Sequence, residues 1–254
     1  MSNTQKNETN EVTVASGFSE LSGMNFLAEA MSDECAGLEF SLDRVKIPAG
    51  GMTAFEVPTG DGETSELEKE IDCVILLSHP ANAYYRDVYK GGSNPPDCGS
   101  FDGVTGSSGQ LCKTCPYNQY GSGEGKAKAC KNRRMLYLLR ENELFPMTLN
   151  LPTGSLRGFT KYVQSLLTVH KRPHQVVTRI SLRKASSSSN IEFSQAVFKC
   201  VRALTPEEQT GIDSMVAQVR GIADSLNTSA LIPADDADNP FVDPETGEII
   251  QPLN

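Results

Sequence analysis

The stretch Ile71 to Ser78, which reads IDCVILLS, decides the fold of this 254-residue chain. Its apolar residues run almost without interruption, as in a strand that is buried on both faces of a sheet. We therefore expect this segment to form the central strand. The rest of the sheet must come from the segments before and after it.

Short segments on both sides of this strand have the patterns of further strands. Upstream, Leu38 to Ile47 alternates apolar and polar residues and Met52 to Val57 follows a Pro-Ala-Gly-Gly turn, so we expect a hairpin. The acidic segment Gly60 to Glu70 is predicted to be a loop. Downstream, Arg134 to Arg140 and Phe145 to Leu151 are predicted strands joined by a Glu-Asn-Glu turn.

The second half of the chain adds two helices and another hairpin. Thr153 to Leu167 has apolar residues at helical spacing behind a Thr or Ser cap, which predicts a helix. Gln175 to Lys184 and Ile191 to Val201 alternate strictly around the Ser-rich turn Ala185 to Asn190, which predicts a β-hairpin. Thr205 opens a Thr-Pro-Glu-Glu helix start, so a second helix should run to about Leu226.

These elements indicate a mainly β, α+β chain, and we expect an OB-like antiparallel β-barrel with one internal helix and a C-terminal helix. Residues 1–34 are expected to be a polar leader with a short helix at Glu20 to Met31. Residues 35–232 should form the core, with an insertion at about 95–132. Residues 233–254 are acidic, contain Pro and lack most aromatics, so we expect a disordered tail.

The cellular compartment is inferred from what the sequence lacks. No segment has the apolar core of a signal peptide or the ~20 apolar residues needed to span a bilayer. We expect a cytoplasmic protein, in which the seven cysteines do not form structural disulfides.

Four cysteines within the insertion have the spacing of a structural zinc site. Cys98 is followed by the pair Cys112 and Cys115 and then by Cys130. A Cys-x2-Cys pair directs two thiolates to one tetrahedral ion, and two more thiolates close the shell around one Zn2+ per chain. A redox pair and an iron–sulfur cluster are the alternatives that this spacing leaves open. The remaining cysteines are expected to be small buried hydrophobic side chains: Cys35, Cys73 and Cys200.

Charge is distributed unevenly along the chain, although the net charge is −9. Between Lys126 and Arg202 there are fifteen Lys and Arg residues against three Glu, a net charge of +12. The residues after Arg202 carry −9 and the first 125 carry −12. A basic middle followed by an acidic end is typical of a nucleic-acid-binding protein with a repelling tail, although a solvated basic face that binds nothing is the alternative.

The basic segment also interleaves aromatic residues with its cations, as a surface that stacks bases and contacts phosphates requires. For any one of these aromatics, a place in the core is the alternative to stacking. The candidate nucleic-acid-binding residues are Lys131, Arg133, Arg134, Tyr137, Arg140, Lys161, Tyr162, Lys171, Arg172, Arg179, Arg183, Lys184, Phe193, Lys199 and Arg202.

Catalytic motifs are not found in the sequence. The chain has three histidines, and it has no Walker-type loop, no Gly-x-Ser-x-Gly elbow and no His-Glu-x-x-His sequence. The acidic residues of the first half show no pattern of a two-metal nuclease. We therefore expect no enzymatic activity.

Two resemblances narrow the expected function. The tail segment Asp235-Asp236-Ala237-Asp238-Asn239-Pro240-Phe241 resembles the acidic tip of bacterial single-stranded DNA-binding proteins, although here thirteen residues follow Phe241. The stretch from Pro95-Pro96-Asp97-Cys98 to Lys131-Asn132-Arg133 resembles proteins of bacteriophages and prophages. A zinc knuckle in an OB-like core is also similar to the helix-destabilising proteins of T4-like phages.

These resemblances imply a phage-type, zinc-containing protein that binds single-stranded DNA without sequence preference during replication or recombination in a bacterial host cell. Its tail would contact replication or recombination proteins, and homo-oligomers of the chain are a separate expectation. The tail residues implied in this contact are Asp235, Asp236, Asp238, Pro240 and Phe241. The alternatives are a zinc-ribbon protein that docks on and regulates a polymerase or other complex, and a nuclease subunit.

Overall fold

A long central strand, β4 (Glu70–Tyr84), organises the fold. Its side chains alternate between two hydrophobic clusters, with Cys73 in one cluster and Val74 in the other. The prediction of a central strand over Ile71 to Ser78, buried on both faces, is therefore confirmed. The strand also continues to Tyr84, because its second half keeps pairing with neighbouring strands beyond the apolar run.

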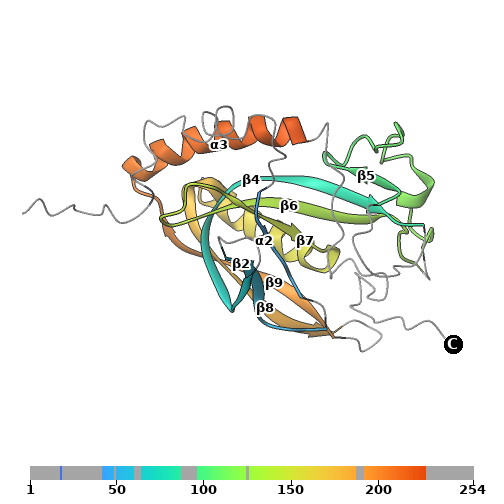
Figure 1. Cartoon of the computed structure of the whole chain (residues 1–254), viewed down its shortest axis with the longest axis horizontal. Helices are drawn as coiled ribbons and strands as arrows, with labels where there is room; N and C mark the ends of the chain where they lie inside the picture. Colours follow the sequence, from blue (N-terminus) through green and yellow to red (C-terminus); the bar gives the residue numbers. More distant parts are fainter. Residues whose placement is uncertain are drawn as a thin grey trace, which may run out of the picture.

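The structure is a computed structural model, and it describes residue 18 and residues 42–48, 50–59, 64–86, 96–123, 126–186 and 192–226. Its main sheet is curled into a half-barrel, with a helix on each side (Figure 1). The strands of this sheet besides β4 are β1 (Arg44–Val45), β5 (Cys98–Ser100), β6 (Lys131–Arg140), β7 (Met147–Leu151), β8 (Val176–Ser186) and β9 (Glu192–Ala203).

Strand order in the sheet is β1-β7-β6-β4-β8-β9, and β5 pairs with the far end of β4. The pairs β6–β7 and β8–β9 are antiparallel neighbours in sequence, which confirms both downstream hairpins. Within the described ranges β1 and β9 are the two ends of the strand order, so the sheet is a curled half-barrel. The chain therefore belongs to the mixed α+β class.

The two helices cover opposite faces of the sheet (Figure 1). Helix α2 (Thr153–Thr168) packs on β9 and β6 inside the curl, and α3 (Pro206–Leu226) lies over the outer face along β4. Both predicted helices are thus confirmed. A single-turn 3-10 helix, η3 (Pro173–Gln175), leads from the end of α2 towards β8.

The starts of the helices differ in how they are capped. Before α3, Thr205 Oγ1 accepts a hydrogen bond from the Glu208 amide at 3.3 Å, and a Glu208 carboxylate oxygen accepts one from the Thr205 amide at 2.8 Å, which confirms the predicted helix start at Thr205 and makes it a capping box. The expected Thr or Ser cap of α2 is wrong. Pro152 occupies the cap position, and the Thr153 hydroxyl instead donates to the Asn132 carbonyl at 2.7 Å.

Of the predicted N-terminal hairpin, Leu38 to Ser41 lie outside the described residues, and the described part is wrong in its main pairing. Strand β1 runs parallel to β7, whereas β2 (Phe55–Pro58) pairs antiparallel with β3 (Ser65–Glu68) in a separate two-stranded sheet. In the described part of the chain a single antiparallel bridge, Lys46 to Glu56, joins the two segments. Strand β3 also lies within the segment predicted to be an acidic loop, because pairing with β2 compensates for its polar sequence.

Several expectations about the remaining segments have different outcomes. Cys73 is buried as expected, but Cys200 is exposed, which corrects its assignment to the core. Cys35, the predicted leader helix and the acidic tail lie outside the described residues.

None of the helices described is both long and apolar enough to cross a membrane.

Candidate metal centre and basic surfaces

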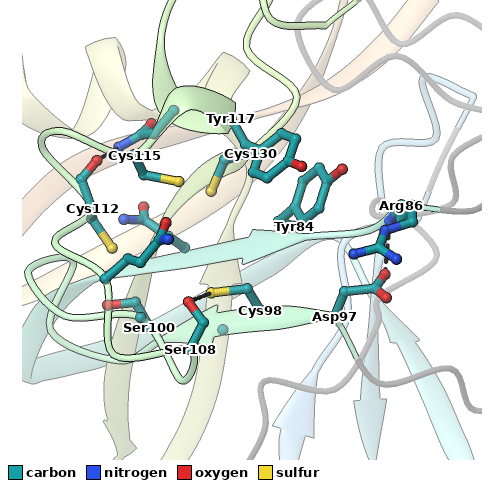
Figure 2. Close-up of a pocket in the computed structure, with 15 residues that line it drawn as sticks. Tyr84, Arg86, Asp97, Cys98, Ser100, Ser108, Cys112, Cys115, Tyr117 and Cys130 are labelled. Carbon is teal, nitrogen blue, oxygen red and sulfur yellow. Dashed lines mark hydrogen bonds between the residues drawn. The ribbon is translucent and has the colours of Figure 1, made fainter.

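The four cysteines of the predicted zinc site line one cavity of about 180 Å³ at the far end of β4. Cys98 is the first residue of β5, Cys130 directly precedes β6, and Cys115 directly precedes the 3-10 helix η2 (Pro116–Asn118). Cys112 lies in the loop between β5 and η2. Figure 2 shows the four side chains arranged around this cavity.

Hydrogen bonds hold the cysteine backbones in place. The Cys112 amide donates to the Val104 carbonyl at 2.8 Å, and the Cys130 amide donates to the Tyr117 carbonyl at the same distance. The Asn118 side chain donates to the Cys112 carbonyl, also at 2.8 Å. The loop therefore brings together cysteines that are up to 32 positions apart in sequence. A long Gly- and Ser-rich segment needs such internal contacts to adopt one conformation.

The surroundings of the sulfur atoms are tightly packed on the β5 side. Cys98 Sγ lies 3.5 Å from the Ser108 hydroxyl oxygen (Figure 2). A Cβ atom added to Gly106 would lie only 2.7 Å from this sulfur, so the glycine leaves room for it. Burial raises the pKa of the Cys98 thiol, but hydrogen bonds from Ser108 and Ser107 outweigh this effect and bring the pKa below its ordinary value.

Cys130 shows the opposite electrostatic balance. Burial, followed by the negative charges of the other three cysteines, raises the pKa of its thiol to about 12. The four sulfurs are therefore close enough to repel one another as thiolates. Such a cluster needs a positive charge before all its members ionise.

The four cysteines have the chemistry of zinc ligands, but their side chains are not arranged as a metal-binding site. The four cysteines are free thiols rather than disulfides, and a set of four thiols is the ligand set of structural zinc sites. However, across the described ranges no three His, Cys, Asp or Glu side chains lie together in an arrangement that could hold a metal ion. The zinc site therefore stays a prediction.

Tyr84 and Arg86 are residues of this cavity that the sequence did not suggest. Tyr84 stacks on Tyr117 with ring centroids 4.2 Å apart, and the Arg86 amide donates to an Asp97 carboxylate oxygen at 2.7 Å (Figure 2). Both follow Ser78, where the predicted strand ended. A predicted strand that continued to Tyr84 would have indicated that these two residues lie next to the loop that contains the four cysteines, which we call the cysteine loop.

Three of the predicted nucleic-acid-binding residues are buried. Tyr137 is 1% exposed and its hydroxyl lies 3.2 Å from His79 Nε2, while Tyr162 is 7% exposed and its hydroxyl lies 2.6 Å from Thr178 Oγ1. Arg133 is also buried. Tyr137 and Tyr162 each belong to one of the two hydrophobic clusters, because their positions on β6 and α2 face the opposing layer, and this burial favours the core alternative for both rings.

Four other predicted bases are paired with carboxylates, which offset their charge. The pairs, with their N to O distances, are Arg140 with Glu68 at 2.9 Å, Arg179 with Asp72 at 2.7 Å, Lys184 with Glu192 at 2.6 Å and Arg202 with Glu208 at 2.7 Å. The hydrogen bond and charge of Asp72 raise the pKa of Arg179 above its ordinary value. Because two of these pairs join distant strands, the sequence alone did not reveal them.

The remaining predicted residues fall into three locations. Lys161 lies on α2, and Lys171 and Arg172 follow that helix, all three exposed. Lys131 and Arg134 are half-buried on β6, where the Arg134 guanidinium donates to the Ser78 hydroxyl at 3.0 Å and lies over the Phe159 ring. The hairpin residues are Arg183, Phe193 and Lys199.

The hairpin residues share one face of β8 and β9. Their neighbours in sequence point into the core, with Leu182 and Ala196 buried against α2, so strand alternation places the three on the outer face. In the antiparallel register Arg183 is opposite Gln195, and Phe193 is opposite Ala185. Helix α3 packs mainly on β4 and η3, and it meets this hairpin at its base, where Val177 lies in the same hydrophobic cluster as α3 and Arg202 pairs with Glu208.

The tail residues predicted to bind a partner lie outside the described residues: Asp235, Asp236, Asp238, Pro240 and Phe241.

Comparison of the chain with family models, curated proteins and solved structures found no match.

Proposed function

We propose that this protein binds single-stranded DNA without sequence preference, on the outer face of the β8–β9 hairpin. The observation that carries the proposal is the placement of Arg183, Phe193 and Lys199 on one face of the hairpin, with Arg183 diagonally opposite Phe193 and Lys199 further along β9. Such a combination of cations and an aromatic side chain suits a flexible strand, whose phosphates and bases are both accessible.

The charges of this surface favour a polyanion. The Arg183 guanidinium donates two hydrogen bonds to Gln195 Oε1, at 2.9 and 2.6 Å. Because the amide is neutral, it orients the guanidinium without cancelling its charge. Lys199 is exposed, and no carboxylate of the described residues forms an ion pair with it. The two cations are thus available to phosphates, in contrast to Arg179 and Arg202.

Apolar side chains complete the surface. Phe193 and Val197 are half-buried on the outer face, two register positions on either side of the Arg183–Gln195 pair, and Val201 further along β9 is exposed. A partly exposed aromatic ring offers a base a stacking partner. The curled sheet, with α2 inside it, would serve as an OB-like support that holds these side chains in place.

We further propose that the four cysteines of the cavity hold one structural zinc ion. When bound, zinc would supply the positive charge that four neighbouring thiolates require. Cys98, Cys112, Cys115 and Cys130 would hold it, joining β5 and the loop to the start of β6. The metal would then fix the geometry of a surface loop and have no part in any reaction.

The test of DNA binding is fluorescence anisotropy of labelled oligo-dT and of a matched duplex, at several salt concentrations. We expect tighter binding to the single strand and a log–log salt slope of about −0.7 per phosphate contact. The double variant Arg183→Ala, Lys199→Ala should weaken binding and flatten the slope by about 1.4.

The matched control is Arg157→Ala, which removes an exposed cation of the same basic segment on α2. It should change neither affinity nor slope. Binding that does not depend on salt, a preference for duplex DNA, or equal effects of the hairpin and control variants would contradict the proposal.

A further inference from the structure

The cysteine loop exposes a large aromatic side chain, Tyr120, to solvent. Tyr120 is 79% exposed, the highest value among the large apolar and aromatic side chains of the described residues. A tyrosine ring in water loses the free energy that its apolar area would gain on burial. The position of this ring outside the cavity therefore suggests a partner other than the protein itself.

The backbone beside Tyr120 is fixed, so its exposure does not result from a loose loop. The Gly121 amide donates to the carbonyls of Lys126 and Ala127, at 3.2 and 3.0 Å. Gly121 has a φ of +83°, a left-handed conformation that a glycine adopts without strain. The Ser122 hydroxyl donates to the Tyr117 carbonyl at 2.9 Å and ties the turn to η2. The ring is thus held out on a rigid turn.

The charges around this ring are positive. Lys128 Nζ lies 4.9 Å from the centroid of the Tyr120 ring, within the range of a cation–π contact. The same ammonium group donates to the side-chain oxygens of Asn118 and Asn132, at 3.3 and 3.1 Å, and these amides leave its charge uncancelled. In sequence, residues 111–131 hold four lysines and one acidic residue, Glu124, which lies outside the described residues.

We propose that Tyr120 is a base-stacking platform, and that Lys126 and Lys128 beside it contact the phosphates of the same strand. This inference rests on the proposed binding of single-stranded DNA and adds a second contact to it, on the cysteine loop. Lys128 occupies one face of the ring, and the exposed remainder accepts a base. Every base has a π-face, so this contact would not select a sequence.

The chain contains no tryptophan, which permits a direct test of stacking. The full-length variant Tyr120→Trp introduces a single indole whose fluorescence a stacked base quenches. We expect saturable quenching on titration with oligo-dT and none with an abasic oligonucleotide of the same length. The control variant Leu67→Trp places an indole at a 64% exposed position on β3, between two glutamates, and should show no quenching.

Affinity measurements complete the test. Tyr120→Ala should weaken oligo-dT binding about 5- to 150-fold, the range for loss of one base–aromatic stack, whereas Tyr120→Phe should bind like the wild type. The stacking role is wrong if Tyr120→Ala binds as tightly as the wild type, or if Tyr120→Trp is not quenched. Should the wild type bind oligo-dT and only the hairpin variant weaken it, the inference alone fails. Should the wild type not bind oligo-dT at all, the proposed function fails with it.

Discussion

The start of α3 is held by a carboxylate that the folded protein keeps ionised. Glu208 accepts hydrogen bonds from both terminal nitrogens of Arg202, at 2.7 and 2.8 Å, and from the Thr205 amide at 2.8 Å. The hydrogen bond from Arg202 is the main cause that lowers the pKa of Glu208 from 4.5 to about 2, against an opposing effect of burial. The substitution that tests this arrangement is Glu208→Gln.

The lowered pKa sets the size of the expected effect and its dependence on pH. A pKa that falls from 4.5 to about 2 corresponds to roughly 3 kcal/mol of stabilisation at neutral pH. Solvent screening reduces this value, because the Arg202 side chain is 41% exposed. Since the folded-state pKa lies below the unfolded one, the stabilisation is complete above pH 4.5 and is lost as the pH falls towards 2. Between pH 6 and pH 3 the loss is ~2 kcal/mol.

Urea unfolding at pH 6 and pH 3 measures this contribution. Glu208→Gln should unfold at lower urea than the wild type at pH 6, and the difference between the two proteins should shrink at pH 3. The control is Glu207→Gln, an exposed residue of the same helical turn, which should change stability by only a few tenths of a kcal/mol. If both variants lose the same free energy, or if the difference for Glu208→Gln does not depend on pH, the assigned role of the ion pair is incorrect.

Three further predictions concern the metal, the tail and the core. Cys112→Ser and Cys115→Ser should each lose bound zinc in metal analysis and unfold, because a structural zinc contributes ~10 kcal/mol or more; wild-type protein without zinc, or with iron, contradicts the site. Deleting residues 234–254, which hold six acidic side chains, should tighten oligo-dT binding most at low salt and end the capture of a replication partner; no change in either measurement contradicts the tail's role. Tyr162→Phe should lower the free energy of unfolding by roughly 1 kcal/mol, through loss of the bond to Thr178, and should leave oligo-dT affinity unchanged.

The elements that the sequence predicted well are those whose signals are local. The β8–β9 hairpin has strict alternation on both strands and a polar turn between them, and α3 has a Thr-Pro-Glu-Glu start. The N-terminal hairpin failed because its partners are distant: Arg44 pairs with Thr148, which follows it by 104 positions. Pairing between strands so far apart depends on the whole sheet and leaves no periodic signal near either one.

The candidate site was likewise predictable only where its signals are local in the sequence. Cysteine spacing placed four thiols on one cavity, because ligand spacing is a local property of a loop. The basic residues were overcounted, since alternation along a strand does not show which bases meet a carboxylate. Arg179 meets Asp72 across 107 positions, and only the register of β4 with β8 brings them together. Strand alternation also could not show that Tyr137 is buried, because its burial depends on the packing of α3 against the sheet.

Strand β4 connects the two surfaces proposed to contact DNA. Its residue Asp72 pairs with Arg179 at the base of the hairpin, and Ala83 pairs with Lys131 next to the cysteine loop. At ~3.3 Å per residue these eleven steps span at most ~36 Å, and less because the strand curls. A strand with the duplex rise of ~3.4 Å per nucleotide needs about ten nucleotides to cover that distance, and an extended strand needs fewer. Arg183 lies four positions beyond Arg179 on β8, away from Ala83, so we expect a strand that contacts both surfaces to need somewhat more than about ten nucleotides at this rise, whereas an oligonucleotide of about three would contact only one.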